Sequence, residues 1–351
     1  MSRGMVIYSN VYIIQRGAFA LLVSTFRAMR RPYRVERATK HRLHVLFVCA
    51  LNLRLKPLLK VAKRIIISLN MAKNDKQWSS ATPGLLIILV DQSGSMMNPY
   101  CDGDSRTVFS AKVINRVINT IIKKNFNKDK PKNRCFISVI GYGYEVKELC
   151  SGFLEDLYNN PIRIENKTQK VSDGNGGLVD TTVNQPIWVE PITKDVWTNM
   201  RDGFRMAKQL VEDWISDKPE CPAPVIINIS DGVPYYDHQD SDTCIQETTA
   251  IAKEILNISN EDGHVLIFNA EIGDGGHKII TPSSEQEVAA AGKPAQFLYD
   301  ISSVIPEGYK DAAKKNELEV KEGSRGCIFN ADAVELIKLI DFGSSKGQGD
   351  K

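Results

Sequence analysis

Three oxygen-bearing side chains stand at alternate positions in the stretch Asp91-Gln92-Ser93-Gly94-Ser95. One carboxylate and two hydroxyls are hard ligands, which suit Mg²⁺ or Mn²⁺ and do not suit a soft metal. Because only Asp91 of the three carries a charge, a metal ion held here would keep much of its attraction for a further anionic group. The spacing therefore predicts a site for a hard divalent cation.

The residues before this stretch predict the element that positions it. Residues 85–90 are all apolar, follow Pro83-Gly84 and give way abruptly to small polar residues. Such a run is typical of a short strand that is buried on both faces. Asp91 then falls at the carboxyl end of the strand, which is where open α/β sheets bind ligands.

Asp91, Ser93 and Ser95 after an apolar strand resemble the metal-ion-dependent adhesion site of von Willebrand factor A (vWA) domains. Two further members of that pattern have counterparts in order along the chain. Thr198, in Trp-Thr-Asn-Met, resembles the threonine loop of the family, and Asp231 follows an apolar run in Ser-Asp-Gly-Val-Pro, as in the family's fourth strand. The resemblance covers roughly residues 80–340.

The resemblance implies a protein-binding module, not an enzyme, in which one Mg²⁺ or Mn²⁺ ion captures an acidic side chain of a partner. The metal residues it implies are Asp91, Ser93, Ser95, Thr198 and Asp231. We expect Ser93 and Ser95 to contact the ion directly and Asp231 to act through water. The expected partner is a protein with an exposed Asp or Glu, in a regulatory or assembly role. Some bacterial members of the family are associated with kinases and phosphatases, so such a system is one source of the partner.

Two tyrosines follow Asp231 closely, and two enzyme classes are alternatives to the binding module. Tyr235 and Tyr236 are expected to form a rim around the metal. A serine hydrolase is disfavoured because Asp91 stands where Gly-x-Ser-x-Gly needs its first glycine. The alternative that stays open is a Mg²⁺-dependent phosphoryl-transfer or receiver-type protein that uses Asp91.

Strand and helix patterns alternate along the chain, which predicts an α/β fold with a doubly wound, Rossmann-like, mostly parallel sheet flanked by helices, the vWA fold. The expected strands lie at residues 135–141, 146–153, 225–229, 264–270 and 296–299, in addition to 85–90. One expected helix follows Ser105 or Asp104 as a cap, a second starts at Asn199, a third is marked by Ile245, Ile251 and Ile255, and the last runs from Asp332 to Ile340.

The predicted domain spans residues 80–342 and contains an insertion at about 155–195. The insertion is interpreted as a hairpin or long loop near the metal face. Its glycine cluster, 173–177, lacks the flanking strand and helix of a phosphate-binding loop. The Gly- and Ser-rich tail, 343–351, is expected to be disordered.

Charge is distributed unevenly along the 351 residues, although the net charge is only +3. Residues 1–70 hold 14 of the 45 Lys and Arg but one of the 42 Asp and Glu, which gives that segment +13 and the remainder −10. A basic arm for membrane surfaces or nucleic acid is one interpretation. The favoured interpretation is that the sequence begins too early and that Met71 is the natural start. On this interpretation the protein binds no nucleic acid. A membrane span is not expected, since no apolar run approaches ~18 residues.

Seven cysteines are dispersed along the chain without a Cys-x-x-Cys pair. This distribution argues against a disulfide framework or a zinc site and favours a reducing compartment. Together with the lack of a convincing signal peptide, it predicts a cytoplasmic protein.

Overall fold

The computed structural model describes residues 74–172, 178–192, 196–273 and 276–348. The chain divides into two units, Met1–Met71 and Ala72–Lys351. All of the described residues belong to the second unit. The basic segment 1–70 and the glycine cluster 173–177 lie outside the described residues.

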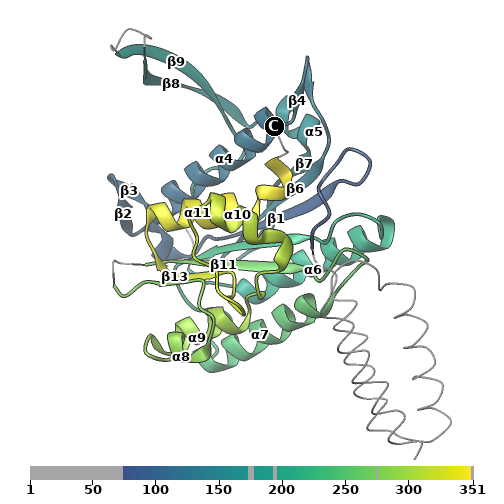
Figure 1. Cartoon of the computed structure of the whole chain (residues 1–351). Coiled ribbons are helices and arrows are strands. Elements are labelled where there is room, and N and C mark those ends of the chain that lie inside the picture. Colours follow the sequence, from purple (N-terminus) through teal and green to yellow (C-terminus); the bar gives the residue numbers. More distant parts are fainter. Residues whose placement is uncertain (1–73, 173–177, 193–195, 274–275, 349–351) are drawn as a thin grey trace, which may run out of the picture. The chain divides into compact units, whose positions relative to one another are not determined.

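A seven-stranded sheet forms the centre of this unit (Figure 1). The strand order is β12-β13-β11-β10-β1-β6-β7, and all neighbouring pairs are parallel except those made by the edge strands β7 and β12. The strands are β1 (Gly84–Asp91), β6 (Cys135–Tyr142), β7 (Val146–Phe153), β10 (Val225–Ser230), β11 (Leu266–Ile272), β12 (Ile279–Ile280) and β13 (Cys327–Ala331). The predicted α/β, doubly wound, mostly parallel sheet is confirmed.

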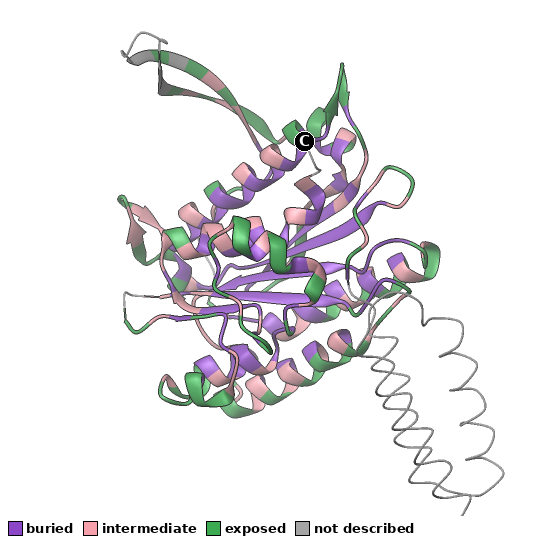
Figure 2. Cartoon of the chain, in the orientation of Figure 1, coloured by how far each residue is buried: buried purple, intermediate pink, exposed green. Residues whose placement is uncertain are grey.

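The apolar run of β1 is buried on both faces because each face of the sheet has its own layer of helices. Leu86, Ile88 and Val90 pack in one core, and the alternate residues 85, 87 and 89 pack in the other. Full burial of one such side chain contributes about 1.5–3 kcal/mol. Figure 2 shows the strands buried between helices whose outer faces are exposed. This double burial explains why the strand reads as a continuous apolar run.

The helices fall into two groups according to the core they cover. The first core is covered by α4 (Arg106–Lys124), α10 (Lys310–Lys315) and α11 (Ala333–Gly343), and the second by α6 (Met200–Asp217), α7 (Ser241–Asn257) and α9 (Gly292–Asp300). The remaining short elements are η1 (Gly94–Met97), β2 (Pro99–Cys101), β3 (Asp104–Ser105), β4 (Phe126–Asn127), β5 (Lys130–Pro131), α5 (Leu154–Asn159), α8 (Glu285–Ala289), η2 (Glu307–Tyr309) and η3 (Ser345–Gln348). Among the described residues, none of the helices combines the length and the apolar character that crossing a membrane requires.

The strand order creates a switch point between β1 and β10. From β1 the chain passes through α4 to β6 on one side, whereas β10 pairs with β1 on the other side. At such a point the loops leaving two neighbouring strands diverge and leave a crevice at their carboxyl ends. Asp91 ends β1 and Asp231 directly follows β10, so the fold brings both carboxylates to this crevice.

Two sequence predictions for the last third of the chain are wrong. Residues 296–299 are not a strand but part of α9, because Phe297 and Leu298 are both buried against the sheet from a helix, while β13 supplies the strand. The tail is ordered as far as Gln348: η3 packs on the domain, and the Asn125 amide donates a hydrogen bond to the carbonyl of Gly347 at 2.7 Å. Composition alone could not reveal this docking.

The insertion consists of α5 and a long two-stranded hairpin, β8 (Arg163–Ser172) and β9 (Leu178–Ile187), which pair with each other throughout. The hairpin extends away from the body in Figure 1. Its base is fixed by Trp188, which is buried and donates its indole N–H to the carbonyl of Leu157 at 2.6 Å. The predicted hairpin is confirmed, and its base is the part anchored to the domain.

Asn115, which is buried on α4, holds the end of this hairpin. Its side-chain oxygen accepts hydrogen bonds from the backbone N–H groups of Trp188 and Val189 at 2.8 and 3.0 Å, and its amide donates to the carbonyl of Val189 at 2.8 Å. The Asn115→Leu variant is expected to lose about 2 kcal/mol of unfolding free energy, because it leaves buried backbone groups unpaired. Urea denaturation measures the loss.

The matched control is Asn257→Leu at the end of α7, where the amide donates to the carbonyl of Lys253 in an exposed position. Its unfolding free energy should change by no more than about 0.5 kcal/mol. Equal effects of the two substitutions would contradict the anchoring role of Asn115.

Candidate metal centre

Asp91 is held rigidly at the end of β1. Its side chain is buried, with the residue 1% exposed. One carboxylate oxygen accepts a hydrogen bond from the backbone N–H of Ser93 at 2.8 Å, and the other accepts from the hydroxyl of Ser230 at 2.9 Å. Burial raises the pKa of Asp91 to about 7, and the nearby charge of Asp231 adds to the rise, while the hydrogen bonds oppose it. The site therefore holds a carboxylate that lacks sufficient compensating positive charge.

The two serines of the motif lie between the two carboxylates. The hydroxyls of Ser93 and Ser95 share a hydrogen bond of 3.0 Å, and Ser95 donates to Asp231 Oδ1 at 2.8 Å. Ser95 belongs to η1, the single turn in which the loop bends back after β1. The structure therefore brings four of the five predicted metal residues into one hydrogen-bonded group.

Arg106, the first residue of α4, makes an ion pair with Asp231. Its guanidinium donates to Asp231 Oδ2 at 2.7 Å, and the two side chains are 6% and 2% exposed. Sequence analysis missed this residue, since an arginine after a helix cap has no distinctive signal. Its position means that Asp231 is already paired with a cation of the protein itself.

Thr198, the fifth predicted metal residue, lies in the loop before α6. It is buried and forms an isolated bridge with Tyr235: the Thr198 N–H donates to the carbonyl of Tyr235 at 2.8 Å, and the reverse bond is 3.1 Å. Because Tyr235 is four residues after Asp231, this bridge ties the threonine loop to the Asp231 loop. The structure thus brings the two loops together, and contact of the threonine hydroxyl with a metal stays a prediction.

The donor set fits a hard divalent cation. Two buried carboxylates and two hydroxyls converge, all of them oxygen donors. Among the described residues, no group of three or more His, Cys, Asp or Glu side chains is placed to hold a metal ion, so serine or threonine hydroxyls would have to complete any ligand set. The mutual repulsion of Asp91 and Asp231 would be relieved by added positive charge. Arg106 provides such charge to Asp231, with which it forms an ion pair.

The two residues predicted to form the rim differ in exposure. Tyr235 is exposed, but Tyr236 is fully buried. The hydroxyl of Tyr236 donates to Glu247 at 2.9 Å, and the guanidinium of Arg201 lies 4.3 Å from its ring centre. Tyr236 is therefore a packing residue between α6 and α7, and a partner cannot reach it. An irregular loop has no helical or strand periodicity, so the sequence could not show which of the two adjacent tyrosines is buried.

Other aromatic residues form a cluster beside the site, and sequence analysis missed two of them as partner contacts. The ring of Trp197, next to Thr198, lies 4.8 Å from that of Tyr144 and 5.4 Å from that of His238. Each loop that carries a predicted metal residue also exposes an apolar side chain, Met97, Val196 or Tyr235, and the neighbouring loop after β6 exposes Tyr144. Met97 follows β1, Tyr144 follows β6 and Val196 precedes α6. We call these four residues the apolar rim.

Glu271 is a third buried carboxylate near this edge, at the end of β11. Burial raises its pKa to about 7, against the effect of the backbone N–H of Asn330, which donates to it at 2.6 Å, and of Arg106. Asp231 adds to the rise. The carboxyl edge of the sheet thus carries a carboxylate on each of three neighbouring strands or the loop directly after it, which increases its demand for positive charge.

The six cysteines in the described part of the chain are free thiols. No protein-family model matches the chain, and no curated protein sequence matches it.

Solved structures are similar to parts of the chain. BatB from Bacteroides thetaiotaomicron is 13% identical, with a TM-score of 0.31 over 54% of this chain and 67% of its own. The ArnB paralog VWA2 from Sulfolobus acidocaldarius is 15% identical, with a TM-score of 0.31 over 57% of this chain and 36% of its own. The pilus adhesin SpaC from Lactobacillus rhamnosus GG is 13% identical, with a TM-score of 0.41 over 77% of this chain and 32% of its own. The chain thus spans two thirds of the first protein and about a third of the other two. The strand order described above gives it a vWA-like fold.

Proposed function

We propose that this chain is a protein-binding module whose contact with its partner depends on Mg²⁺ or Mn²⁺. The observation that carries the proposal is the hydrogen-bonded group of Asp91, Ser93, Ser95 and Asp231 at the switch point between β1 and β10. These residues, with Thr198, would hold the ion. Once bound, the ion would supply positive charge and an exchangeable position for an acidic side chain of the partner.

The residues at this site have different roles. Asp91 accepts bonds from Ser93 N–H and Ser230, which fixes the loop in which the Ser95 hydroxyl faces Asp231 and the Ser93 hydroxyl contacts that of Ser95. Neutral hydroxyls leave a bound cation more attractive to an incoming carboxylate than further acids would. Asp231 has to leave Arg106 at least in part when it serves a metal, so the protein's own arginine competes with the ion.

The apolar rim suggests what surrounds the acidic side chain of the partner. Met97, Val196 and Tyr235 are exposed in the loops that carry the predicted metal residues, and Tyr144 is exposed in the loop after β6, with its ring centre 4.8 Å from that of Trp197. Their arrangement suits a partner in which an Asp or Glu stands beside apolar residues. We infer a regulatory or assembly role in the cytoplasm, with no catalytic step.

The alternative function, phosphoryl transfer with Asp91 as the acceptor, is less well supported. A nucleophilic carboxylate needs an accessible oxygen. Asp91 is 1% exposed, and each of its oxygens already accepts a hydrogen bond. Burial of this kind suits an orienting residue better than a nucleophile.

Calorimetric titration with Mg²⁺ tests the proposal. Wild type is expected to bind in the millimolar range or tighter, and Ser95→Ala is expected to bind about tenfold more weakly, since about 1.4 kcal/mol of ligand contact is lost. The matched control is Ser151→Ala on β7, where the serine hydroxyl also donates to a carboxylate, that of Glu148 at 2.6 Å. It should bind like wild type. No binding by wild type would overturn the metal site.

Selection from a random peptide library displayed on phage tests acid capture separately. Peptides bound in Mg²⁺ and released by EDTA are expected to share an Asp or Glu next to an apolar residue. If wild type binds Mg²⁺ but the EDTA-released peptides share no acidic residue, the metal site stands and the capture of an acidic side chain is refuted.

A further inference from the structure

Tyr142 lies beside the first of the three loops that carry the predicted metal residues. These are the loop after β1, the loop before α6 and the loop after β10, and we call them the metal loops. Tyr142 is the last residue of β6, is fully buried, and pairs in register with Asp91 at the end of β1. Its carbonyl accepts a hydrogen bond from the backbone N–H of Gln92 at 2.8 Å. The backbone of Tyr142 therefore holds the start of the loop after β1.

The side chain of Tyr142 reaches across β1 to β10. Because β1 lies between β6 and β10 in the sheet, the outer two strands are roughly 10 Å apart. The phenol hydroxyl spans this gap with its partner and donates to Asn228 Oδ1 on β10 at 2.8 Å. Asn228 stands three residues before Asp231. The phenol thus links β6 to the strand that leads to Asp231, on the face of the sheet that α6 covers.

The loop before α6 depends on the same side chain through the first turns of that helix. A Cβ at Gly203 would lie 3.0–3.2 Å from three side-chain atoms of Tyr142, so the helix rests directly against the phenol at a spacing that favours glycine. The sulfur of Met200, the first residue of α6, lies 3.9 Å from the amide nitrogen of Asn228. Met200 stands two residues after Thr198. The position of this loop therefore depends on the Tyr142 ring and on its hydrogen-bond partner.

Further hydrogen bonds hold Asn228 in the orientation that Tyr142 requires. The Asn228 amide donates to Asn269 Oδ1 on β11 at 3.0 Å, so its own oxygen faces the phenol. The Asn269 amide donates to the hydroxyl of Ser302 at 2.8 Å, and that hydroxyl donates to the carbonyl of Leu298 at 2.6 Å. The four side chains of this network belong to residues that are each 0% exposed. Because buried polar groups are costly unless they are paired, such a complete network fixes the relative positions of the elements it joins.

We propose that Tyr142 is a positioning residue of the metal centre, which sets the spacing among the loops that carry Asp91, Thr198 and Asp231. The inference rests on the proposed function, since it concerns the same metal site. Tyr142 is fully buried, so it acts through the starting positions of the three loops and not through contact with a partner. Mg²⁺ demands near-ideal octahedral geometry, which makes its affinity sensitive to small displacements of the oxygen donors.

Calorimetric titration of Tyr142→Phe with Mg²⁺ tests the positioning role. The substitution removes only the hydroxyl and leaves the ring against α6, so the protein should fold, with Asn228 Oδ1 left unpaired. Residues that orient metal ligands through hydrogen bonds affect metal affinity by about 10–100-fold. The variant is therefore expected to bind Mg²⁺ about tenfold more weakly than wild type.

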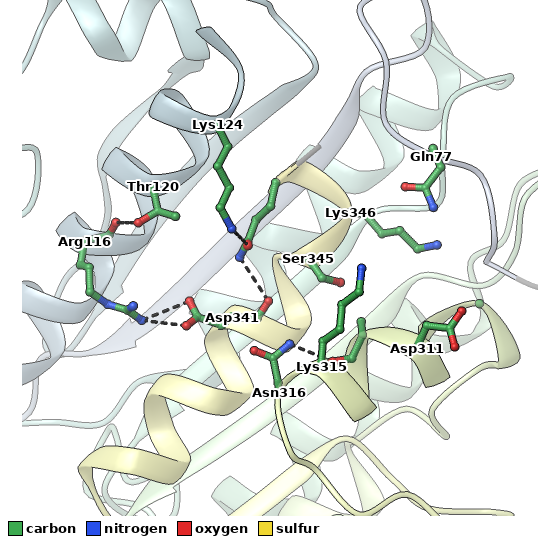
Figure 3. A pocket seen from close by; sticks show the side chains of 13 residues that line it. Gln77, Arg116, Thr120, Lys124, Asp311, Lys315, Asn316, Asp341, Ser345 and Lys346 are labelled. Atoms are coloured by element: carbon green, nitrogen blue, oxygen red, sulfur yellow. Dashed lines mark hydrogen bonds and ion pairs between the residues drawn. The ribbon is translucent and has the colours of Figure 1, made fainter. Parts of the chain in front are cut away.

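Two control variants each remove one hydroxyl outside the metal loops. Ser302→Ala breaks the far end of the same network, leaves the Tyr142 bond in place, and should lower the urea midpoint to a similar extent as Tyr142→Phe. Thr120→Val removes a hydroxyl that donates to the carbonyl of Arg116 at 2.7 Å, near the end of α4 (Figure 3). Both controls are expected to bind Mg²⁺ like wild type.

The outcomes separate this inference from the proposed function. If wild type binds Mg²⁺ and Tyr142→Phe binds it equally well, the positioning role is wrong and the metal site stands. An equal loss of affinity in Ser302→Ala would also contradict the positioning role, because the effect would then follow stability and not the placement of the loops. A wild type that binds no Mg²⁺ would overturn the proposed function and this inference together.

Discussion

Replacement of Asp91 by Asn is expected to have opposite effects on stability and on metal binding. In EDTA at pH 8 the variant should be more stable than wild type by about 2–4 kcal/mol, because a pKa raised from 3.8 to about 7 costs ~1.4 kcal/mol per unit once the group is ionised. The Mg²⁺ affinity of the Asp91→Asn variant should fall by at least about a hundredfold, since a buried charge at the site is lost.

The local hydrogen bonds allow this substitution without a new unpaired group. The Asn oxygen can accept from the Ser93 N–H as Asp91 does. Its NH₂ group can donate to the Ser230 hydroxyl oxygen, and the Ser230 hydroxyl can then donate to the carbonyl of Gly232, which it already meets at 3.0 Å. The variant thus changes charge and leaves the packing nearly unchanged.

The sign of the pH dependence follows from the direction of the pKa shift. A carboxyl whose pKa is higher in the folded state than in the unfolded state binds its proton more tightly when folded. Its favourable contribution is therefore present below about pH 4 and is lost as the pH rises to about 7. Metal-free wild type should lose stability over this window, and Asp91→Asn should lose less. Urea denaturation at pH 5 and pH 8 measures the difference.

Asp262→Asn is the matched control, because Asp262 is also buried but, among the described residues, accepts hydrogen bonds only from the backbone N–H groups of Lys76 and Ala223. An NH₂ group would face one of these donors, so this variant should be less stable by about 1–3 kcal/mol and should bind Mg²⁺ like wild type. A destabilised Asp91→Asn that still binds Mg²⁺ would contradict the roles assigned to Asp91.

Replacement of Arg106 by Met is expected to destabilise the metal-free protein by about 3–5 kcal/mol, because it leaves the carboxylate of Asp231 buried without its cation. The Asp231 side chain is only 2% exposed and lies near the charge of Asp91. Addition of Mg²⁺ should restore much of the loss, and Mg²⁺ affinity should rise about tenfold, since the competing cation is gone. Thermal unfolding with EDTA and with Mg²⁺ measures both effects.

Arg116→Met on the same helix is the control for this prediction. Arg116 pairs with Asp341, but the two side chains are 42% and 25% exposed, so the pair is screened by solvent and its loss should cost no more than about 1 kcal/mol. The double variant Arg106→Met with Asp231→Asn removes the buried charge and should recover most of the stability without Mg²⁺. Equal stability of Arg106→Met and wild type in EDTA would refute the buried pair.

Sequence determined those features that depend on short-range patterns. The apolar run 85–90 identifies β1 because a strand buried on both faces needs no polar alternation, and Asp91, Ser93 and Ser95 then follow from their spacing alone. Asp231 is found in the same way, as the polar residue after a second such run. Alternation of strands and helices was sufficient for the doubly wound sheet, since parallel neighbours require crossover helices.

Tertiary structure alone decided which side chains meet across the chain. Arg106 pairs with Asp231 although 125 residues separate them, and no local pattern marks the partner of a buried charge. Tyr236 is buried and Tyr235 exposed because α6 and α7 cover one side of their loop. Residues 345–348 are ordered because Asn125 and Lys124 bind them. Each outcome depends on packing between distant segments, whose free energy the local sequence does not encode.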